Sequence, residues 1–170
     1  MTLVHTALLS EGQSIIEYFK LNLIGKNPTL YSNNKVLLLV GGIGIKRTKK
    51  TLEYVFDNHI QITKAINIGI AGCSDVNIKI GQLFITNKIL KNINHMKLHT
   101  VKKAKTGYSN YKALYDMEGS VFNITALQYL EKENIYIFKI VSDYLNSTIP
   151  KKEVIKQLIK SNLQSIVKWI

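Results

Sequence analysis

Three acidic residues each come after a segment that the sequence predicts as a β-strand: Glu11, Glu118 and Asp143. In open α/β sheets, ligands bind outside the carboxyl ends of the strands. Carboxyl groups gathered at such an edge can accept hydrogen bonds from a ligand and exchange protons with it. The sequence therefore predicts a polar ligand site there, although each residue could instead be a charge at a helix N-terminus or in a turn.

The segments that must position these carboxylates alternate between strand and helix. Continuous apolar runs at 35–40, 65–70 and 135–142 are typical of strands buried on both faces. Further strands are expected at 3–9 and 96–101, and loops or hairpins at 22–34, 71–75 and 102–111. Four helices are expected: one with its N-cap at Ser10, one from Gly44 to about Asn58, one at 119–131, and a last one that begins at Pro150. This order predicts a single α/β domain over residues 1–170, with a central, mostly parallel, twisted sheet between two layers of helices.

Four short strings around the acidic residues are distinctive. They are Thr6-Ala7-Leu8-Leu9-Ser10-Glu11, Asn67-Ile68-Gly69-Ile70-Ala71-Gly72, Asp116-Met117-Glu118-Gly119 and Val141-Ser142-Asp143. In order and spacing they resemble the nucleoside phosphorylase/nucleosidase superfamily, and most of all its methylthioadenosine/S-adenosylhomocysteine nucleosidase and futalosine hydrolase branch. The resemblance runs from Leu3 to the C-terminal helix. It implies a protein that binds a small-molecule purine nucleoside and breaks its N-glycosidic bond without a cofactor or a metal ion.

The resemblance also implies a role for each residue of the site. Asp143 matches the general acid that protonates N7 of the leaving purine, and Ser142 matches the hydroxyl that orients it. Glu118 matches the carboxylate that accepts a ribose hydroxyl, and Met117 the thioether that packs on the sugar. Glu11 matches the group that takes a proton from the attacking water.

The string at 67–72 bears on whether water or phosphate is the nucleophile. Ile70 and Gly72 are expected to line the substrate site. Phosphorylases of this superfamily hold phosphate with arginines and a serine, whereas Asn67 and Ile70 stand at an arginine and the serine position here. Lys139 stands where the nucleosidases carry an arginine near the water. Because an arginine fork holds phosphate bidentately, its loss favours water.

Hydrolysis of a purine nucleoside is therefore the predicted function, with a 5′-substituted adenosine as the expected substrate. Two alternatives stay open: a phosphate-dependent nucleoside phosphorylase, and a shortened nucleoside-binding domain without catalysis. The resemblance further implies a homodimer or a larger homo-oligomer. Tyr108 and Tyr111 are candidates for stacking on the base.

Composition argues against several other classes of protein. The net charge is +12, but only Arg47 among the 23 basic residues is an arginine, and the lysines are scattered, which disfavours nucleic-acid binding. The longest apolar run, 36–45, is too short for a membrane span, which takes about 20 residues. The single cysteine, Cys73, cannot form an internal disulfide, so a cytoplasmic location is expected.

Two motifs that could indicate other chemistry are incomplete. The string Gly42-Ile43-Gly44 lacks the third glycine of a dinucleotide site, because Arg47 stands in its place. His95 and His99 are four residues apart, but no cysteine or third histidine lies nearby in the sequence, so no metal site is expected.

Overall fold

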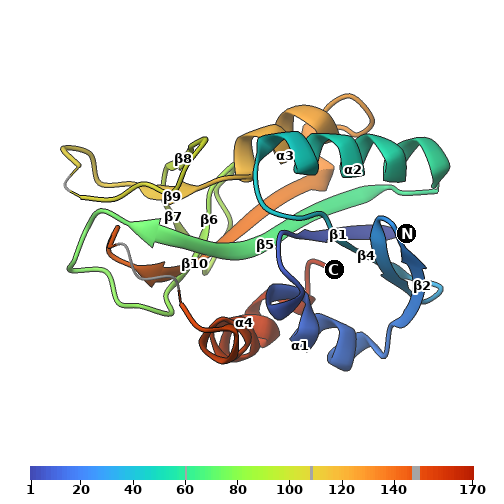
Figure 1. Cartoon of the computed structure of the whole chain (residues 1–170), viewed down its shortest axis with the longest axis horizontal. Helices are drawn as coiled ribbons and strands as arrows, with labels where there is room; N and C mark the ends of the chain where they lie inside the picture. Colours follow the sequence, from blue (N-terminus) through green and yellow to red (C-terminus); the bar gives the residue numbers. More distant parts are fainter. Residues whose placement is uncertain (60, 108, 147–149) are drawn as a thin grey trace.

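A mixed β-sheet runs through the centre of the molecule in the computed structural model, which describes residues 1–59, 61–107, 109–146 and 150–170 (Figure 1). Its strands follow the order β2-β3-β4-β1-β5-β10-β6-β7, and β9 pairs with β5 and with β8. The strands are β1 (Thr2–Thr6), β2 (Asn22–Lys26), β3 (Thr29–Ser32), β4 (Val36–Val40), β5 (Lys64–Cys73), β6 (Leu83–Ile85), β7 (Asn94–His95), β8 (Leu98–Thr100), β9 (Leu114–Asp116) and β10 (Ile135–Asp143). The helices are α1 (Leu9–Phe19), α2 (Ile45–Asn58), α3 (Gly119–Ala126) and α4 (Lys152–Val167), with a 3₁₀ turn at Lys132–Asn134.

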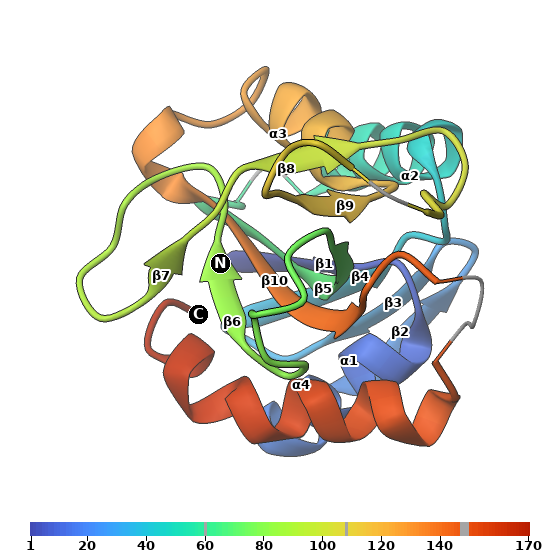
Figure 2. The ribbon, with the colours of Figure 1, turned by 90° about the vertical axis from the view of Figure 1, so that its left-hand side faces the viewer.

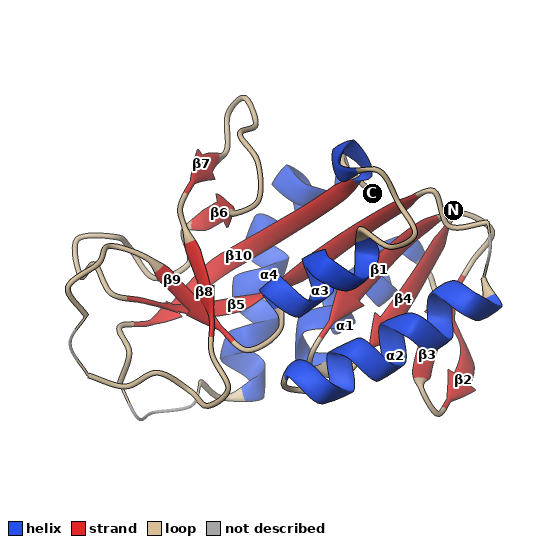
Figure 3. Ribbon diagram, turned by 90° about the horizontal axis from the view of Figure 1, so that it is seen from above, coloured by secondary structure: helices blue, strands red, loops and turns tan. Residues whose placement is uncertain are grey.

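The middle of the sheet is parallel. Strands β4, β1, β5 and β10 run in one direction, with Leu3 beside both Leu37 and Ala65, and Ala65 beside Ile135. Antiparallel strands flank them, since β3 pairs with β4 and β6 with β10. The carboxyl ends of the four parallel strands therefore open onto the same edge of the sheet (Figure 3).

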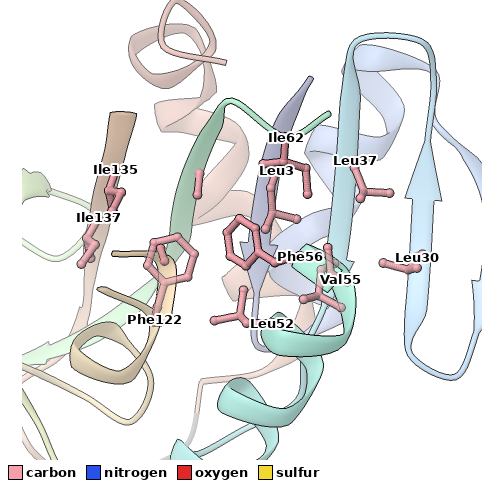
Figure 4. Packing of buried hydrophobic residues seen from close by; sticks show 13 residues of the cluster. Leu3, Leu30, Leu37, Leu52, Val55, Phe56, Ile62, Phe122, Ile135 and Ile137 are labelled. Carbon is pink, nitrogen blue, oxygen red and sulfur yellow. The ribbon is translucent and has the colours of Figure 1, made fainter. Parts of the chain in front are cut away.

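Helices α2 and α3 cover one face of this sheet (Figure 1). Leu3 and Leu37 from the strands pack there with Leu52 of α2 and Phe122 of α3 (Figure 4). The opposite face carries α1 and α4, whose apolar side chains pack against the other side of the same strands.

Alternate residues of each central strand point to opposite faces. In β4, Leu37 and Leu39 join the cluster under α2 and α3, whereas Val36 and Leu38 join the cluster under α1 and α4. A strand buried on both faces needs apolar residues at every position. The structure thereby confirms the predicted α/β fold, with a mostly parallel central sheet between layers of helices.

The first strand and helix differ from the prediction. Strand β1 ends at Thr6 rather than at residue 9, and α1 begins at Leu9, so Leu8 and not Ser10 occupies the N-cap position. The Glu11 carboxylate accepts the backbone N–H groups of Ala7 and Leu8, both at 2.9 Å. The Glu11 side chain therefore binds backbone N–H groups at the start of α1, the role that the sequence had assigned to Ser10.

Strand β5 is longer than predicted. The segment 71–75 was expected to be a loop of small residues, but β5 continues to Cys73. Gly72 and Cys73 pair with Tyr115 and Leu114 of β9, so a second strand holds this segment extended. Small residues fit here because they lie between two strands.

Two helices and one strand also differ in their bounds. Helix α3 ends at Ala126 rather than at residue 131, although Leu130 still packs against the cluster under α3. The apolar pattern therefore extends beyond the helix itself. The strand expected at 96–101 covers only Leu98–Thr100, and α4 begins at Lys152, two residues after Pro150. None of the described helices is long and apolar enough to cross a membrane.

Candidate active site

A cavity of about 380 Å³ lies at the carboxyl edge of the parallel strands, the edge that faces the viewer in Figure 2. Its volume falls in the range of small-molecule sites. All seven residues predicted for catalysis or for contact with the sugar and the substrate line it, namely Glu11, Ile70, Gly72, Met117, Glu118, Ser142 and Asp143. The fold thus brings together side chains that are far apart in the sequence.

Glu11 is held rigidly at one end of the cavity. Its side chain extends from the first turn of α1, and the residue is only 3% exposed. Oε2 accepts the N–H groups of Ala7 and Leu8, and Oε1 accepts the N–H group of Ile70 at 2.9 Å. Burial raises the pKa of this carboxyl group, although Lys139 and the three backbone donors oppose the rise. A carboxylate with a raised pKa is a stronger base than a free glutamate, and its fixed orientation suits it to accept a proton from a ligand.

A buried ion pair, which the sequence did not predict, lies next to Glu11. Lys139 Nζ is 2.8 Å from Asp116 Oδ2, and the two side chains are 2% and 1% exposed. A Cβ atom added to Gly69 would lie 2.8 Å from Glu11 Oε1 and 3.3 Å from Lys139 Nζ, so both groups converge on the space that this glycine leaves open. Burial disfavours the charge of Lys139, but the neighbouring carboxylates, Asp116 above all, outweigh it and raise its pKa.

Glu118 stands at the N-terminus of α3, in the middle of the site. Its Oε1 accepts the N–H group of Gly44 at 2.7 Å, which ties the start of α3 to the loop before α2. Burial raises the pKa of Glu118, whereas Lys139 and the Gly44 N–H group oppose the rise. Met117 precedes it and also lines the cavity. Glu118 and Met117 therefore place a hydrogen-bond acceptor and a thioether next to each other in the lining of the cavity.

Asp143 ends β10 at another part of the wall. The Ser142 hydroxyl donates to Asp143 Oδ2 at 2.7 Å, and the Leu145 N–H group donates to Oδ1 at 2.9 Å. A Cβ atom on Gly72 would lie 3.0 Å from Oδ1, so the glycine allows the carboxyl group to lie close to β5. Asp143 is half-buried, and its orientation is fixed by a hydroxyl and a backbone donor.

The positions where a phosphate-binding arginine and serine were expected take no part in an anion site. Asn67 Nδ2 lies 2.8 Å from His5 Nδ1, beneath the cavity rather than in its lining. His5 is fully buried, and burial, with the charge of Lys139 in addition, lowers its pKa to about 3. Ile70 lines the cavity, but its N–H group is occupied by Glu11.

Neither tyrosine proposed for base stacking is placed in the site. Tyr108 lies outside the described residues, and Tyr111 is 72% exposed and absent from the described lining of the cavity. Tyr115 of β9 lines the cavity instead, and its hydroxyl is 2.6 Å from that of Ser109. Tyr115 rather than Tyr111 reaches the cavity, because the short pairing between β5 and β9 carries this residue, four positions later, to the cavity.

The Asp116–Lys139 pair has one signal in the sequence. Lys139 interrupts the apolar run of β10, between Phe138 and Ile140, on a strand predicted to be buried on both faces. Lysine is almost never buried without a partner, so its position points to an unseen carboxylate. The sequence does not reveal which one, since Asp116 lies on a three-residue strand reached through a loop.

Comparison with known proteins places this geometry in context. Neither a protein-family model nor a curated protein sequence matches the chain. Among solved structures, the 5′-methylthioadenosine/S-adenosylhomocysteine nucleosidase from S. pneumoniae with the transition-state inhibitor MT-ImmA matches with a TM-score of 0.80 and 15% identity, over 99% of this chain and 98% of that chain. The futalosine hydrolase from Helicobacter pylori strain 26695 matches with a TM-score of 0.80 and 10% identity, over 99% and 97%.

The chain has the nucleosidase fold. A third structure, the nucleosidase from Colwellia psychrerythraea 34H in complex with adenine, matches with a TM-score of 0.79 and 15% identity, over 99% of this chain and 93% of that chain. The nucleosidase fold confirms the structural side of the resemblance carried by the four strings. At such identities the fold is what is shared, so the reaction has to be argued from the site. Within the described residues, no group of three or more His, Cys, Asp or Glu residues is arranged to hold a metal ion.

Proposed function

We propose that this protein hydrolyses the N-glycosidic bond of a purine nucleoside. The observation that carries the proposal is the gathering of Asp143, Glu118 and Glu11 around one cavity on a nucleosidase fold. Breaking such a bond gives the sugar oxocarbenium character and transfers electrons to the departing base. The reaction therefore needs a proton donor for the base, an acceptor that holds the sugar and a base for the water.

Each of these three chemical roles has a candidate residue in the cavity. Asp143, held by Ser142, donates a proton to N7 of the purine as the bond breaks. Glu118 accepts a hydrogen bond from a ribose hydroxyl, and Met117 packs against the sugar. Glu11 accepts a proton from the water that attacks the anomeric carbon. The negative charges of Glu11 and Glu118 also favour a sugar that is becoming positive.

Water fits the Glu11 end of the cavity better than phosphate. A phosphate ion would need cationic or N–H donors there. The Ile70 N–H group already binds Glu11, Lys139 is paired with Asp116, and the Asn67 amide is hydrogen-bonded to a buried histidine. A phosphate placed beside the Glu11 carboxylate would also be repelled by its charge.

Lys105 is the only cationic side chain among the described residues that line the cavity. It belongs to the exposed loop 101–107, where the Gly107 N–H group donates to the Leu145 carbonyl at 2.9 Å. Leu145 in turn donates its N–H group to Asp143. The loop that carries Lys105 is thus tied to the Asp143 end of the cavity, where we propose that the base leaves.

A 5′-substituted adenosine is the substrate that we propose. Leu8, Ile43 and Ile155 give the cavity apolar lining, which suits an uncharged substituent. Gly44, next to Ile43, donates to Glu118, so this part of the lining lies beside the proposed sugar site. Two of the similar structures are named for 5′-methylthioadenosine, and one of them holds adenine.

The experiment that tests the proposal is a product assay on 5′-methylthioadenosine. We expect adenine and 5-methylthioribose in phosphate-free buffer, and no acceleration when phosphate is added at millimolar concentration. Strict dependence on phosphate, with a ribose 1-phosphate product, would show a phosphorylase. Thermal stabilisation by the nucleoside without turnover would show a binding domain.

A further inference from the structure

Asp116 is a buried hub whose carboxylate oxygens are both in use. Oδ1 accepts the Thr100 hydroxyl at 2.6 Å. Oδ2 accepts the Gly119 N–H group at 2.7 Å and lies 2.8 Å from Lys139 Nζ. The residue is 6% exposed, and with both oxygens engaged it has little capacity left to bind a ligand itself. Its contacts lead instead toward two carboxylates that line the cavity, Glu11 and Glu118.

One set of contacts leads to Glu11. Asp116 fixes the ammonium group of Lys139, and that group converges with Glu11 Oε1 at the space beside Gly69. A side chain at position 69 would fill this space. Without Asp116, the flexible lysine stem would have no anchor on the side away from Glu11.

Another set of contacts leads to Glu118. Gly119, which donates to Asp116, is the first residue of α3, and Glu118 is its N-cap residue. The Thr100 hydroxyl that donates to Asp116 also accepts the Ser120 N–H group at 2.8 Å. Asp116 and Thr100 together therefore hold the first turn of α3, from which Glu118 reaches Gly44.

We propose that Asp116 is a positioning residue that fixes Glu11, through Lys139, and Glu118, through the start of α3, relative to each other across the cavity. The proposal deepens the nucleosidase function above and rests on it for its catalytic consequence. Misplacing a reacting group by about 1 Å can cost about 10²-fold in rate. One residue that sets both carboxylates is thus worth as much to turnover as a group that touches the substrate.

The test is Asp116→Asn, which keeps the size of the side chain and one of its two acceptor oxygens but removes its charge. We expect kcat/KM on 5′-methylthioadenosine to fall about 10²-fold, mainly through kcat. The matched control is Asp75→Asn, because Asp75 also pairs with a lysine, Lys112, at 2.9 Å, but neither residue is among the described residues that line the cavity. That variant should keep its activity within twofold.

Two backbone amides report the positions of the carboxylates without any turnover. The Ile70 N–H group donates to Glu11, and the Gly44 N–H group donates to Glu118. Both amide resonances should move in Asp116→Asn and stay in place in Asp75→Asn. Loss of activity with both resonances unmoved, or activity within twofold of the wild type, would overturn the proposal.

The amide measurement also separates this proposal from the proposed function. If the wild type hydrolyses no nucleoside, the nucleosidase function fails, while the two resonances still decide whether Asp116 positions Glu11 and Glu118. If Asp116→Asn does not fold, Thr100→Val serves instead, because it removes the hydroxyl that bonds Asp116 and the Ser120 N–H group and keeps the buried charges. It should shift the Gly44 resonance and lower kcat about tenfold; an unmoved Gly44 resonance and unchanged kcat would contradict the proposal.

Discussion

The cavity ends on one side in a buried group of charges and on the other in a half-buried carboxyl group beside an exposed loop. At the first end, Glu11 accepts three backbone N–H groups and lies close to the Lys139–Asp116 pair. At the second end, Asp143 has a hydroxyl and one backbone donor, and the loop 101–107 that is tied to Leu145 is largely exposed.

The buried Glu11 end and the half-buried Asp143 end are suited to different tasks. The Glu11 end is part of the core, so its geometry is set by folding and costs no reorganisation when substrate binds. The Asp143 end borders solvent, so the base of the proposed substrate could enter and leave there while the proposed acid stays oriented. Changes at the first end should therefore affect stability strongly, whereas changes at the second should affect mainly rate.

The largest expected effect is on the exposed side of this comparison. Asp143→Asn removes the proposed proton donor, and kcat should fall by about 10²–10⁴-fold. Because the residue is half-buried and forms no ion pair among the described residues, the free energy of unfolding should change by less than about 1 kcal/mol. Steady-state kinetics and urea unfolding measure both quantities; near wild-type turnover would show that Asp143 is not the acid.

Lys139→Met tests the buried side. Removing one partner of a buried pair leaves Asp116 without its counter-charge, and this should lower the free energy of unfolding by about 3–5 kcal/mol. The double variant Lys139→Met/Asp116→Asn should regain part of that loss, because no uncompensated charge then remains between them. Lys112→Met removes a lysine whose side chain is 77% exposed, and it should cost less than about 1 kcal/mol in the same urea titration. Equal losses for the two single variants would mean that burial does not distinguish the pairs.

The sequence predicted the exposed half of this comparison better than the buried half. Asp143 follows an apolar run that only a doubly buried strand explains, and a neighbouring serine in the sequence proved to be its hydrogen-bond donor. The partner of Lys139 depends on where β9 crosses the end of β5, a contact between segments separated by irregular chain. Such a contact depends on the packing of the whole fold, and no local pattern encodes it.

His5 makes the buried side sensitive to pH. Its pKa falls from 6.5 in the unfolded chain to about 3 in the folded protein. Between these values the unfolded chain binds a proton that the folded protein does not. The stabilising contribution is therefore complete above pH 6.5 and is lost as the pH falls, by about 1.4 kcal/mol per pH unit.

His5→Gln isolates this contribution, because glutamine does not titrate. Glu11 and Glu118 act in the opposite direction, since their raised pKa values stabilise the folded protein at low pH and this is lost as the pH rises past 4.5. Both proteins share that effect, so the difference between them reports His5 alone. Urea unfolding between pH 4.5 and 7 should show a steeper loss on acidification for the wild type than for the variant. Parallel curves would mean that His5 is protonated in the folded protein.

The smallest effect is expected at Glu118, which lies between the two ends. Glu118→Gln keeps an oxygen that can accept the Gly44 N–H group, so α3 should keep its place. What is lost is the charge-assisted hydrogen bond to a ribose hydroxyl, about twice as strong as a neutral one, so nucleoside binding should weaken roughly tenfold. Free adenine has no ribose, and its affinity should therefore stay the same. Calorimetric titration of both proteins at pH 8 with adenine and with a non-hydrolysable nucleoside analogue measures the two affinities. An equal loss for both ligands would place Glu118 outside the sugar site and assign it to the buried framework with Glu11.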